Sequence, residues 1–353
     1  MSQRPGSHDG AETFRTSPAA TPPAVSAVPS PMRVGPRVFA WGTRTFVMGV
    51  LNATPDSFSG DGVFDPADAA GGAIGGAAGG AGGRPSGGPP DPIAAAVARA
   101  DRMVADGADI LDVGGESSRP GHDPVEAKEE ARRVVPVVAA VRLAHPGVAI
   151  SVDTTKPAVA EAALDAGADL LNDVWGVAED DALCRVAAER GAPIVLMHNR
   201  GETRYRALIA EVVADLERAI ERAMRAGVAW EAIIVDPGFG FGKTPDHNLE
   251  LLRRLEALRL LGRPVLLGTS RKSTLGKVLD LPVRDRLEAT LATTALAIAA
   301  GVDIVRVHDV RENVRAARMA DAVVRGWRLD ASASSDLTSP SLAASASGRD
   351  HAR

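Results

Sequence analysis

The 353-residue sequence has a single cysteine, no long apolar run and no excess of basic residues, and each absence excludes a class of protein. One cysteine, Cys184, cannot build an internal disulfide framework, which suits a reducing compartment. No apolar stretch is long enough to span a bilayer, and the N-terminus lacks the charged-then-apolar order of a signal peptide. A formal net charge of -5 argues against general nucleic-acid binding, because phosphate backbones attract basic surfaces. We therefore expect a cytoplasmic protein without nucleic-acid or membrane partners.

The rest of the composition is that of a soluble globular protein, with 45% apolar and 24% charged residues. Residues 1–36 and 331–353 depart from it: they are rich in small residues and proline or serine, with no apolar period. We expect both to be disordered tails, because they bury too little surface to offset the entropy of ordering. Residues 70–90 are mostly Gly and Ala and lack the flanking strand and helix of a dinucleotide-binding loop, so we interpret them as a flexible insertion. One domain, residues 37–330, remains.

Within this domain, short β-branched runs alternate with longer Ala-rich amphipathic stretches, which is the pattern of βα units. Glycines such as Gly107, Gly167 and Gly301 mark the joins where a helix ends before the next strand. The predicted strands are residues 45–51, 110–113, 148–152, 169–171, 193–197, 232–235, 264–267 and 304–307. Eight units of this length predict a single-domain α/β fold, the (β/α)₈ TIM barrel, with the insertion in its first βα loop. An open doubly wound sheet is the alternative.

Every predicted strand ends in polar residues, and in a parallel barrel these ends meet at the face where active sites lie. Four of the side chains offer donors and acceptors of fixed geometry: Asp153, Asn172, Asp236 and Lys272. Such a set suits a flat heterocycle with ring nitrogens, an exocyclic amine and an oxo group. Four others form a cationic or donor cluster that suits phosphate oxygens: Asn52, Arg119, Arg306 and His308. Asn52 also offers an amide oxygen to Mg²⁺ carried in by a diphosphate.

Two further patterns suggest other sites. Residues 238–244, GFGFGKT, look like a phosphate-binding P-loop, but Pro237 stands where the motif requires its first Gly. We interpret this segment as a wall of the site after the sixth strand. A zinc site built on His198, Asp236 and His308 is the other possibility, although no close ligand spacing supports it.

Eight segments, in order along residues 47–310, resemble those of the dihydropteroate synthases. They are MGVLNATPDSFS, DVGGESSRPG, SVDTTKP, LLNDVWG, VLMH, DPGFGFGKT, LLGTSRKS and IVRVHDV. Members of that family are transferases of folate biosynthesis and targets of sulfonamides. They join 6-hydroxymethyl-7,8-dihydropterin diphosphate to 4-aminobenzoate and release diphosphate and 7,8-dihydropteroate. The resemblance also implies Mg²⁺ as cofactor and a homodimer.

The resemblance implies a role for each matching residue. The pterin site would be Asp153, Asn172, Met197, Asp236 and Lys272. The diphosphate pocket would be Asn52, which also holds the metal, with Ser118, Arg119, Arg306 and His308. The 4-aminobenzoate site would be Phe58, Pro120, Phe241 and Ser273. The catalytic residues implied are Lys272, Asp236 and Arg119.

Two other functions stay open at this point. A methyltetrahydrofolate methyltransferase also holds a pterin in such a barrel, but methyl transfer needs no diphosphate pocket. A non-catalytic pterin-binding paralogue is the second, against which the retained Lys272, Arg306 and His308 argue. In the first loop, Asp61 stands one residue away from the carboxylate common in the family.

Overall fold

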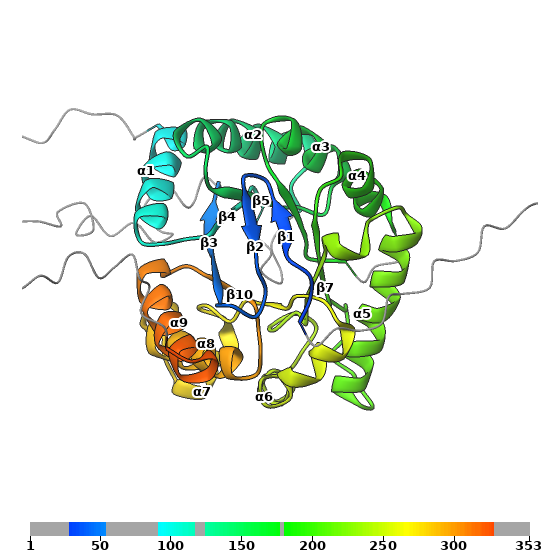
Figure 1. Ribbon diagram of the computed structural model, residues 1–353, viewed down its shortest axis with the longest axis vertical. Coiled ribbons are helices and arrows are strands. Elements are labelled where there is room, and N and C mark those ends of the chain that lie inside the picture. The colour runs from blue at the N-terminus through cyan, green and yellow to red at the C-terminus, as the bar shows by residue number, and fades with distance from the viewer. Residues whose placement is uncertain (1–27, 54–90, 117–123, 177–179, 328–353) are drawn as a thin grey trace, which may run out of the picture.

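The computed structural model describes residues 28–53, 91–116, 124–176 and 180–327. In this part of the chain, eight parallel strands form a ring with the helices outside it (Figure 1). The hydrogen-bonded order is β8-β7-β6-β5-β4-β3-β10-β9, and a bridge between Val235 and Val265 joins β8 to β9. The ring is therefore closed, which confirms the predicted (β/α)₈ barrel and rules out the open sheet.

The barrel strands are β3 (Phe46–Asn52), β4 (Ile110–Gly114), β5 (Ala149–Asp153), β6 (Leu170–Asp173), β7 (Ile194–Met197), β8 (Ile233–Asp236), β9 (Leu266–Leu267) and β10 (Ile304–Val307). Each overlaps a range predicted from the sequence. The pairing register sets Asp153 level with Asn172, and Met197 level with Asp236. The two residues of each pair therefore lie side by side on neighbouring strands.

The outer helices are α1 (Pro92–Ala105), α2 (Ala127–Ala144), α3 (Pro157–Asp165), α4 (Ala182–Arg190), α5 (Leu208–Arg225), α6 (Pro245–Arg253), α7 (Ser273–Leu279), α8 (Leu287–Ala299) and α9 (Val310–Arg325), with 3₁₀ turns η3 (Trp230–Ala232), η4 (Leu255–Leu261) and η5 (Val283–Asp285). Local chemistry sets several of their ends. Thr244 caps α6 by accepting a hydrogen bond from the His247 amide at 3.2 Å, and Pro245 follows as the first helical residue. Gly191 ends α4 in the left-handed region, with φ of 62°.

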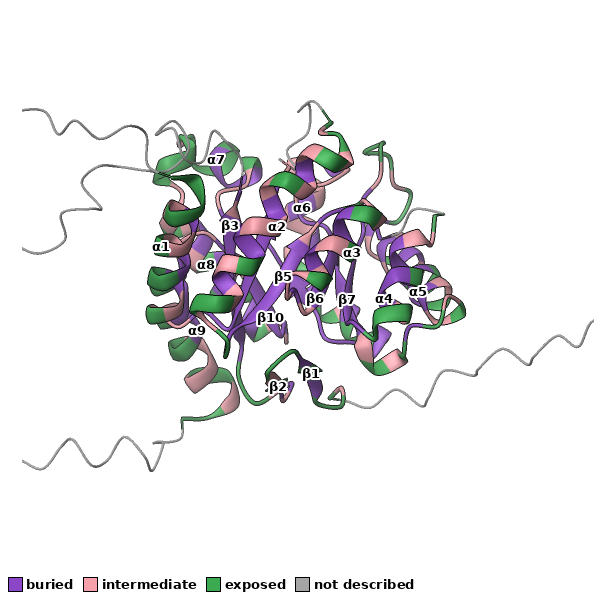
Figure 2. Cartoon of the chain, turned by 90° about the horizontal axis from the view of Figure 1, so that it is seen from above, coloured by how far each residue is buried: buried purple, intermediate pink, exposed green. Residues whose placement is uncertain are grey.

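A short hairpin closes one end of the barrel. Strands β1 (Met32–Val34) and β2 (Arg37–Phe39) pair antiparallel and lie across the opening in Figure 1 and below the barrel in Figure 2. The ring centroids of Phe39 and Phe46 are 4.7 Å apart, so the hairpin packs onto the base of β3. One buried apolar cluster joins the hairpin and the inside of the barrel: Met32, Val34, Phe39, Trp41, Phe46, Met48, Ile110, Ala149, Leu170, Val195, Ile234, Leu266 and Ile304.

The hairpin corrects the expectation that residues 1–36 form a disordered tail, which was wrong for residues 28–36. Met32 and Val34 are buried while Arg33 between them is exposed, an alternation too short to stand out among prolines and serines. Gly35 makes the turn with φ of 54°. Residues 1–27, the Gly-rich insertion at 70–90 and residues 331–353 lie outside the described residues.

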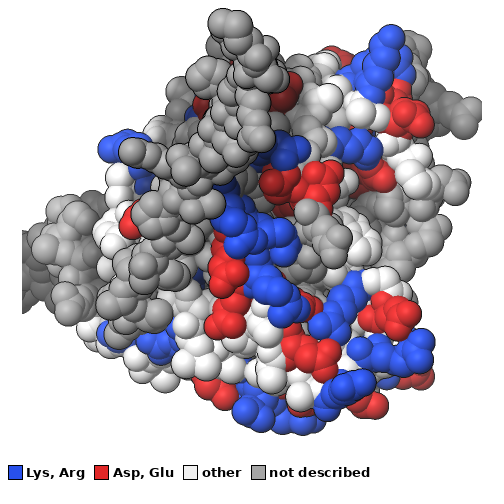
Figure 3. All heavy atoms as spheres, turned by 90° about the vertical axis from the view of Figure 1, so that its right-hand side faces the viewer, with Lys and Arg blue, Asp and Glu red and all other residues white. Residues whose placement is uncertain are grey.

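The outer surface carries mixed charge. On the face that includes α5, basic and acidic side chains are interspersed (Figure 3). This agrees with the small net charge of -5. Among the described residues, none of the helices combines the length and apolar character needed to cross a bilayer.

We expect Phe39→Ala to lower the free energy of unfolding by about 3–5 kcal/mol, because it leaves a cavity under the barrel. Urea denaturation followed by circular dichroism measures this change. The matched control is Val38→Ala on the same strand, whose side chain is 56% exposed and whose loss should cost no more than about 0.5 kcal/mol. Equal effects of the two substitutions would show that the hairpin does not close the core.

Candidate active site at the strand ends

The residues predicted from the sequence do gather at the carboxyl ends of the strands. Asn52, Asp153, Asn172, Met197 and Asp236 are the last or next-to-last residues of β3, β5, β6, β7 and β8. Arg306 lies within β10 and His308 directly follows it, while Lys272 lies between β9 and α7, immediately before that helix. Four more predicted residues, Phe58, Ser118, Arg119 and Pro120, lie outside the described residues, as does Asp61. Their roles, including the catalytic role of Arg119, stay predictions.

Arg306 connects two acidic strands across the barrel. Its Nε donates to Asp112 Oδ2 at 2.6 Å, and its Nη2 donates to Asp153 Oδ2 at 2.7 Å. Asn172 Nδ2 donates to the same oxygen of Asp112 at 3.2 Å. These contacts fix the orientation of one acceptor, one amide and one cation at the mouth of the barrel.

Asp112 is a site residue that the sequence reasoning missed. It stands in the middle of β4 rather than at its end, and its side chain is fully buried. One signal in the sequence could have identified it: Asp112 is a charged residue inside an otherwise apolar strand. A buried carboxylate is costly unless it pairs with a cation, so its presence there indicates a partner. Among the described residues, Asp112 Oδ1 has no hydrogen-bond partner.

Asp112 and Asp153 share one cation, Arg306, so this side of the site, called the acidic side below, has two carboxyl groups for one guanidinium. Burial raises the pKa of Asp153 to about 7; Arg306 opposes the shift and Asp112 adds to it. For Arg306, burial lowers the pKa, but the two carboxylates outweigh burial and raise it above the ordinary value. Because one guanidinium is shared by two carboxyl groups, a ligand with N–H donors would stabilise their charged forms.

Asp236 and Lys272 form the second part of the site. Burial raises the pKa of Asp236, and the Lys272 ammonium opposes this. Burial lowers the pKa of Lys272 to about 7, with Asp236 acting in the other direction. The Gly238 amide donates to Asp236 Oδ1 at 2.7 Å, while Lys272 Nζ donates to the Phe239 carbonyl and lies 4.2 Å from the centre of the Phe241 ring.

The loop after β8 comes so close to its neighbours that its glycines are required. A Cβ on Gly238 would lie 1.8 Å from the His198 carbonyl oxygen, and one on Gly240 would lie 2.7 Å from Lys272 Cδ. Both glycines have positive φ, at 68° and 83°. The loop is a wall against the site, as interpreted from the sequence.

The P-loop and zinc alternatives do not fit this geometry. Lys243 is buried and donates to the carbonyls of Gly238 and Phe241, both at 3.1 Å, so it turns into its own loop rather than toward a phosphate. Both ring nitrogens of His198 are engaged, one with Lys243 and one with Asp215. Among the described residues, no three His, Cys, Asp or Glu side chains are grouped so as to hold a metal.

The segment after β9 is tied to the segment after β10. Ser270 Oγ lies 2.9 Å from His308 Nδ1, and Arg271 Nε donates to Asp309 Oδ2 at 3.1 Å. Arg271 has φ of 58°, a left-handed conformation that costs a non-glycine residue free energy and persists when its surroundings hold it. This turn carries Lys272, next to the exposed Ser273 at the start of α7.

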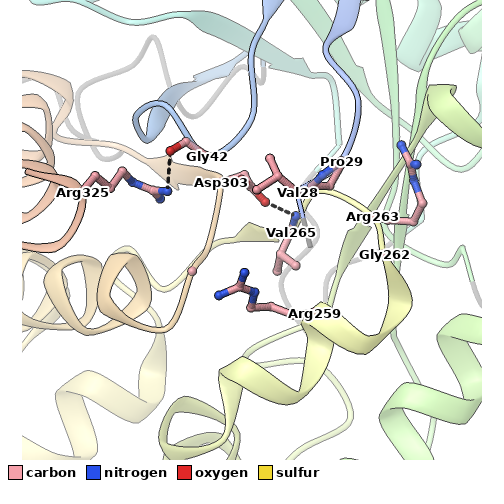
Figure 4. Close-up of a pocket in the computed structure, with 10 residues that line it drawn as sticks. Val28, Pro29, Gly42, Arg259, Gly262, Arg263, Val265, Asp303 and Arg325 are labelled. Atoms are coloured by element: carbon pink, nitrogen blue, oxygen red, sulfur yellow. Dashed lines mark hydrogen bonds between the residues drawn. The ribbon is translucent and has the colours of Figure 1, made fainter. Parts of the chain in front are cut away.

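A separate cavity of about 140 Å³ lies at the opposite end of the barrel, before β9 and β10 (Figure 4). Two pairs of its lining residues bond to each other: Arg325 Nη1 donates to the Gly42 carbonyl at 3.2 Å, and the Val265 amide donates to Asp303 Oδ2 at 3.0 Å. None of the residues predicted for the site lines it. The strand-end cluster is therefore the candidate active site.

Comparison with known proteins decides the family. Residues 87–308 match the model of the pterin binding enzymes. The dihydropteroate synthase of Clostridium beijerinckii is 45% identical over 295 residues, which covers 83% of this chain and 100% of the relative. That of Bacillus subtilis is 44% identical over 289 residues, covering 82% and 92%. The chain belongs to the dihydropteroate synthase family.

Solved structures of family members agree. Dihydropteroate synthase from Clostridium difficile, in the presence of pteroic acid, has a TM-score of 0.71 and 45% identity and covers 81% of this chain and 99% of its own. The Xanthomonas albilineans enzyme with 4-aminobenzoic acid has a TM-score of 0.71 at 37% identity, covering 83% and 97%. The same enzyme with 7,8-dihydropteroate has a TM-score of 0.70 at 35% identity, covering 83% and 98%. The family resemblance and the fold expected from the eight motifs are confirmed.

The raised pKa of Asp153 predicts a pH effect on stability. Between about 3.9, the value of an unfolded chain, and about 7, the folded state holds a proton that the unfolded chain has released. The stability from this group is therefore fully present below about pH 4 and is lost as the pH rises to about 7. Asparagine does not titrate, so Asp153→Asn does not lose stability in this way. Its free energy of unfolding should therefore rise relative to that of wild type as the pH goes from about 4 to about 7.

Urea titrations of both proteins at several pH values test this, and the contribution of Asp236 cancels in the difference. The control is Asp165→Asn, whose carboxyl is exposed and paired with Arg190. Arg190 lowers the pKa of Asp165, so the stability from this pair is present at neutral pH and is lost only toward acid pH. The difference between this control and wild type should therefore stay constant as the pH rises from about 4 to about 7. A difference between Asp153→Asn and wild type that does not change with pH would contradict the prediction.

Proposed function

We propose that this chain condenses 6-hydroxymethyl-7,8-dihydropterin diphosphate with 4-aminobenzoate to form 7,8-dihydropteroate and diphosphate. The observation that carries the proposal is the juxtaposition of Asp153, Asn172 and Arg306 with the Asp236–Lys272 pair at the strand ends of a dihydropteroate synthase barrel. Methyl transfer releases no diphosphate, so it would give no role to Arg306 and His308, the basic side of this site.

The acidic side is suited to the pterin. Asp153 and Asp236 are acceptors for N–H groups of an amino-pyrimidinone edge, and carboxylates accept such paired bonds strongly. Asn172 and Lys272 complete the donors and acceptors around the rings. Met197, with 3% of its surface exposed at the end of β7, offers an apolar wall for the flat heterocycle.

The basic side is suited to the diphosphate. Arg306 and His308 lie on or just after β10 and supply cationic or donor groups to phosphate oxygens. Asn52 ends β3 half-buried, and its amide oxygen is a ligand of the kind that Mg²⁺ takes. Because Mg²⁺ keeps several waters and arrives with substrate phosphates, one protein oxygen is enough, so the residues present fit the ion. Bound there, Mg²⁺ would offset negative charge on the leaving group.

The reaction is a substitution at the pterin methylene carbon. The bond from this carbon to the diphosphate oxygen breaks, the aniline nitrogen forms the new C–N bond, and the proton of that nitrogen leaves to solvent. The electron-rich pterin, held by Asp153 and Asp236, stabilises positive charge on the methylene carbon. Orientation and electrostatic stabilisation carry the catalysis, and no covalent nucleophile is needed. We assign Phe241 and Ser273 to the 4-aminobenzoate, and the family resemblance implies the same role for Phe58 and Pro120.

We expect Asp236→Ala and Lys272→Ala each to lower the turnover number by about 100-fold or more, because each removes a group aimed at the pterin. Incubation of purified protein with the pterin diphosphate and 4-aminobenzoate, with chromatography of the dihydropteroate formed, measures this. Lys277→Ala on the exposed side of α7 is the matched control and should keep wild-type turnover. Near-normal product from either site variant would overturn the assignment, and absence of product from wild type would favour a non-catalytic paralogue.

We also propose that the chain works as a cytoplasmic homodimer. Large apolar side chains are exposed on neighbouring elements at the C-terminal end of the described chain: Leu296, Met319, Val323 and Trp327 are 60%, 66%, 72% and 74% exposed. Such a group on one side of a protein is typical of a surface that another chain covers.

The dimer proposal predicts that Val323→Asp combined with Met319→Asp converts the protein to monomers, because two buried charges at an interface are costly. Sedimentation velocity gives the mass of each form. Leu143→Asp is the control, since Leu143 is 86% exposed on the distant helix α2 and should not affect assembly. A wild-type protein that sediments as a monomer would refute the proposal.

A further inference from the structure

A buried lysine lies directly behind the site, and the reaction described above gives it no role. Lys243 lies in the loop between β8 and α6 and is 8% exposed. Its Nζ has three acceptors around it, the Gly238 carbonyl at 3.1 Å, the Phe241 carbonyl at 3.1 Å and His198 Nδ1 at 2.9 Å. An ammonium group has three hydrogens to donate, so these three acceptors match it fully.

The imidazole behind Lys243 is held as an acceptor. His198 is fully buried, and its Nε2 lies 3.1 Å from Asp215 Oδ2 on α5. Burial and the neighbouring Lys243 lower the pKa of His198 to about 4, so the ring is neutral at pH 7. With its one proton directed to Asp215, Nδ1 is left to accept from Lys243. Burial lowers the pKa of Lys243 itself to about 7, and the Asp236 carboxylate opposes this shift.

Asp215 is fixed in turn from the outside. Arg200 donates to its Oδ2 from both Nε, at 2.9 Å, and Nη2, at 2.6 Å, and Arg200 also binds Glu211 at 2.9 Å. A continuous series of polar contacts therefore runs from α5 through His198 to Lys243. Its inner end is the pair of carbonyls of Gly238 and Phe241.

Those two carbonyls bracket the part of the loop that touches the site. Between them, the Phe239 carbonyl accepts from Lys272, and at one end the Gly238 amide donates to Asp236. At the other end the Phe241 ring lies against Lys272 Nζ. The glycines of this segment have no side chains of their own to pack, so contacts to its backbone decide its shape.

Burial of a lysine amine is a costly way to fill space, because an apolar side chain of similar size would do so without losing the hydration of a polar group. The contacts of Lys243 are specific to the loop carbonyls and to His198. We propose that Lys243 is a positioning residue, which holds residues 238–241 in the conformation that places Asp236, Lys272 and Phe241 for binding of the pterin and 4-aminobenzoate. This inference rests on the proposed function for the identity of the two ligands.

The test compares Lys243→Met, which keeps the length of the side chain but has no donor, with Lys243→Arg, which keeps donors, and with the exposed control Lys277→Met. The dissociation constant of pteroic acid, measured by fluorescence titration, reports the site without turnover. We expect Lys243→Met to raise it by about 10- to 100-fold, as displaced binding groups do, and to raise the Michaelis constant for 4-aminobenzoate. Lys243→Arg should recover part of the loss, and Lys277→Met should match wild type.

Urea denaturation of the same proteins separates positioning from stability. Unchanged pteroic acid affinity in folded Lys243→Met overturns the proposal, and so does loss of the fold in both Lys243 variants, because the lysine would then serve stability alone. The two proposals fail separately. A wild-type protein that binds pteroic acid in a Lys243-dependent way but makes no dihydropteroate would refute the activity and leave the positioning role standing.

Discussion

The arrangement of the site depends on one guanidinium that serves two buried carboxylates. Arg306 reaches Asp112 and Asp153 from across the barrel, and Asn172 bonds to the same oxygen of Asp112. The strand register sets Asp153 beside Asn172, and Asp112 lies two residues below the level of Asp153, so these contacts tie together polar groups at the top of an apolar interior. Removal of the cation would leave two carboxyl groups buried without compensation, which is among the costliest defects in a protein. The same arrangement divides the site, because the side rich in carboxylates suits N–H donors and the side that Arg306 and His308 border suits an anion.

The sequence predicts most of this fold because its local signals agree with the final structure. β-branched runs, helix-ending glycines such as Gly191 and the Thr244–Pro245 cap each act over a few residues, so the barrel strands were found within about two residues at each end. The hairpin at residues 32–39 was missed since its three-residue strands are stabilised by rings from elsewhere, not by their own pattern. Asp112 was missed for a related reason: its partner, Arg306, is 194 residues away, and no local spacing reports such a contact. The roles of Phe58 and Arg119, which lie outside the described residues, are implied only by the family resemblance.

The segment GFGFGKT has the composition of a phosphate-binding loop, but here it contacts a carboxylate of the protein itself. In a P-loop, backbone amides and a lysine surround a bound phosphate. Here the Gly238 amide points to the carboxylate of Asp236, a part of the protein, and the lysine turns back to the carbonyls of its own loop. The conformational freedom of glycine is used for close approach to His198 and Lys272 rather than for room around a ligand. The same composition therefore builds the wall of a site, and Pro237 at the start of the segment was the residue that distinguished the two cases.

The hairpin that closes the lower end of the barrel also limits the directions from which small molecules can reach the site. With Phe39 and Trp41 packed into that end, small molecules reach the strand ends from the loop side alone. Asn172 and Asp236 lie deep, at 3% and 5% exposure, whereas Ser273 lies at the surface. The described residues of the site therefore differ in depth, from the buried strand ends to the exposed start of α7. Closure at the base of the barrel thus leaves the polar strand ends facing the loop side, with Asn172 and Asp236 at the deeper level.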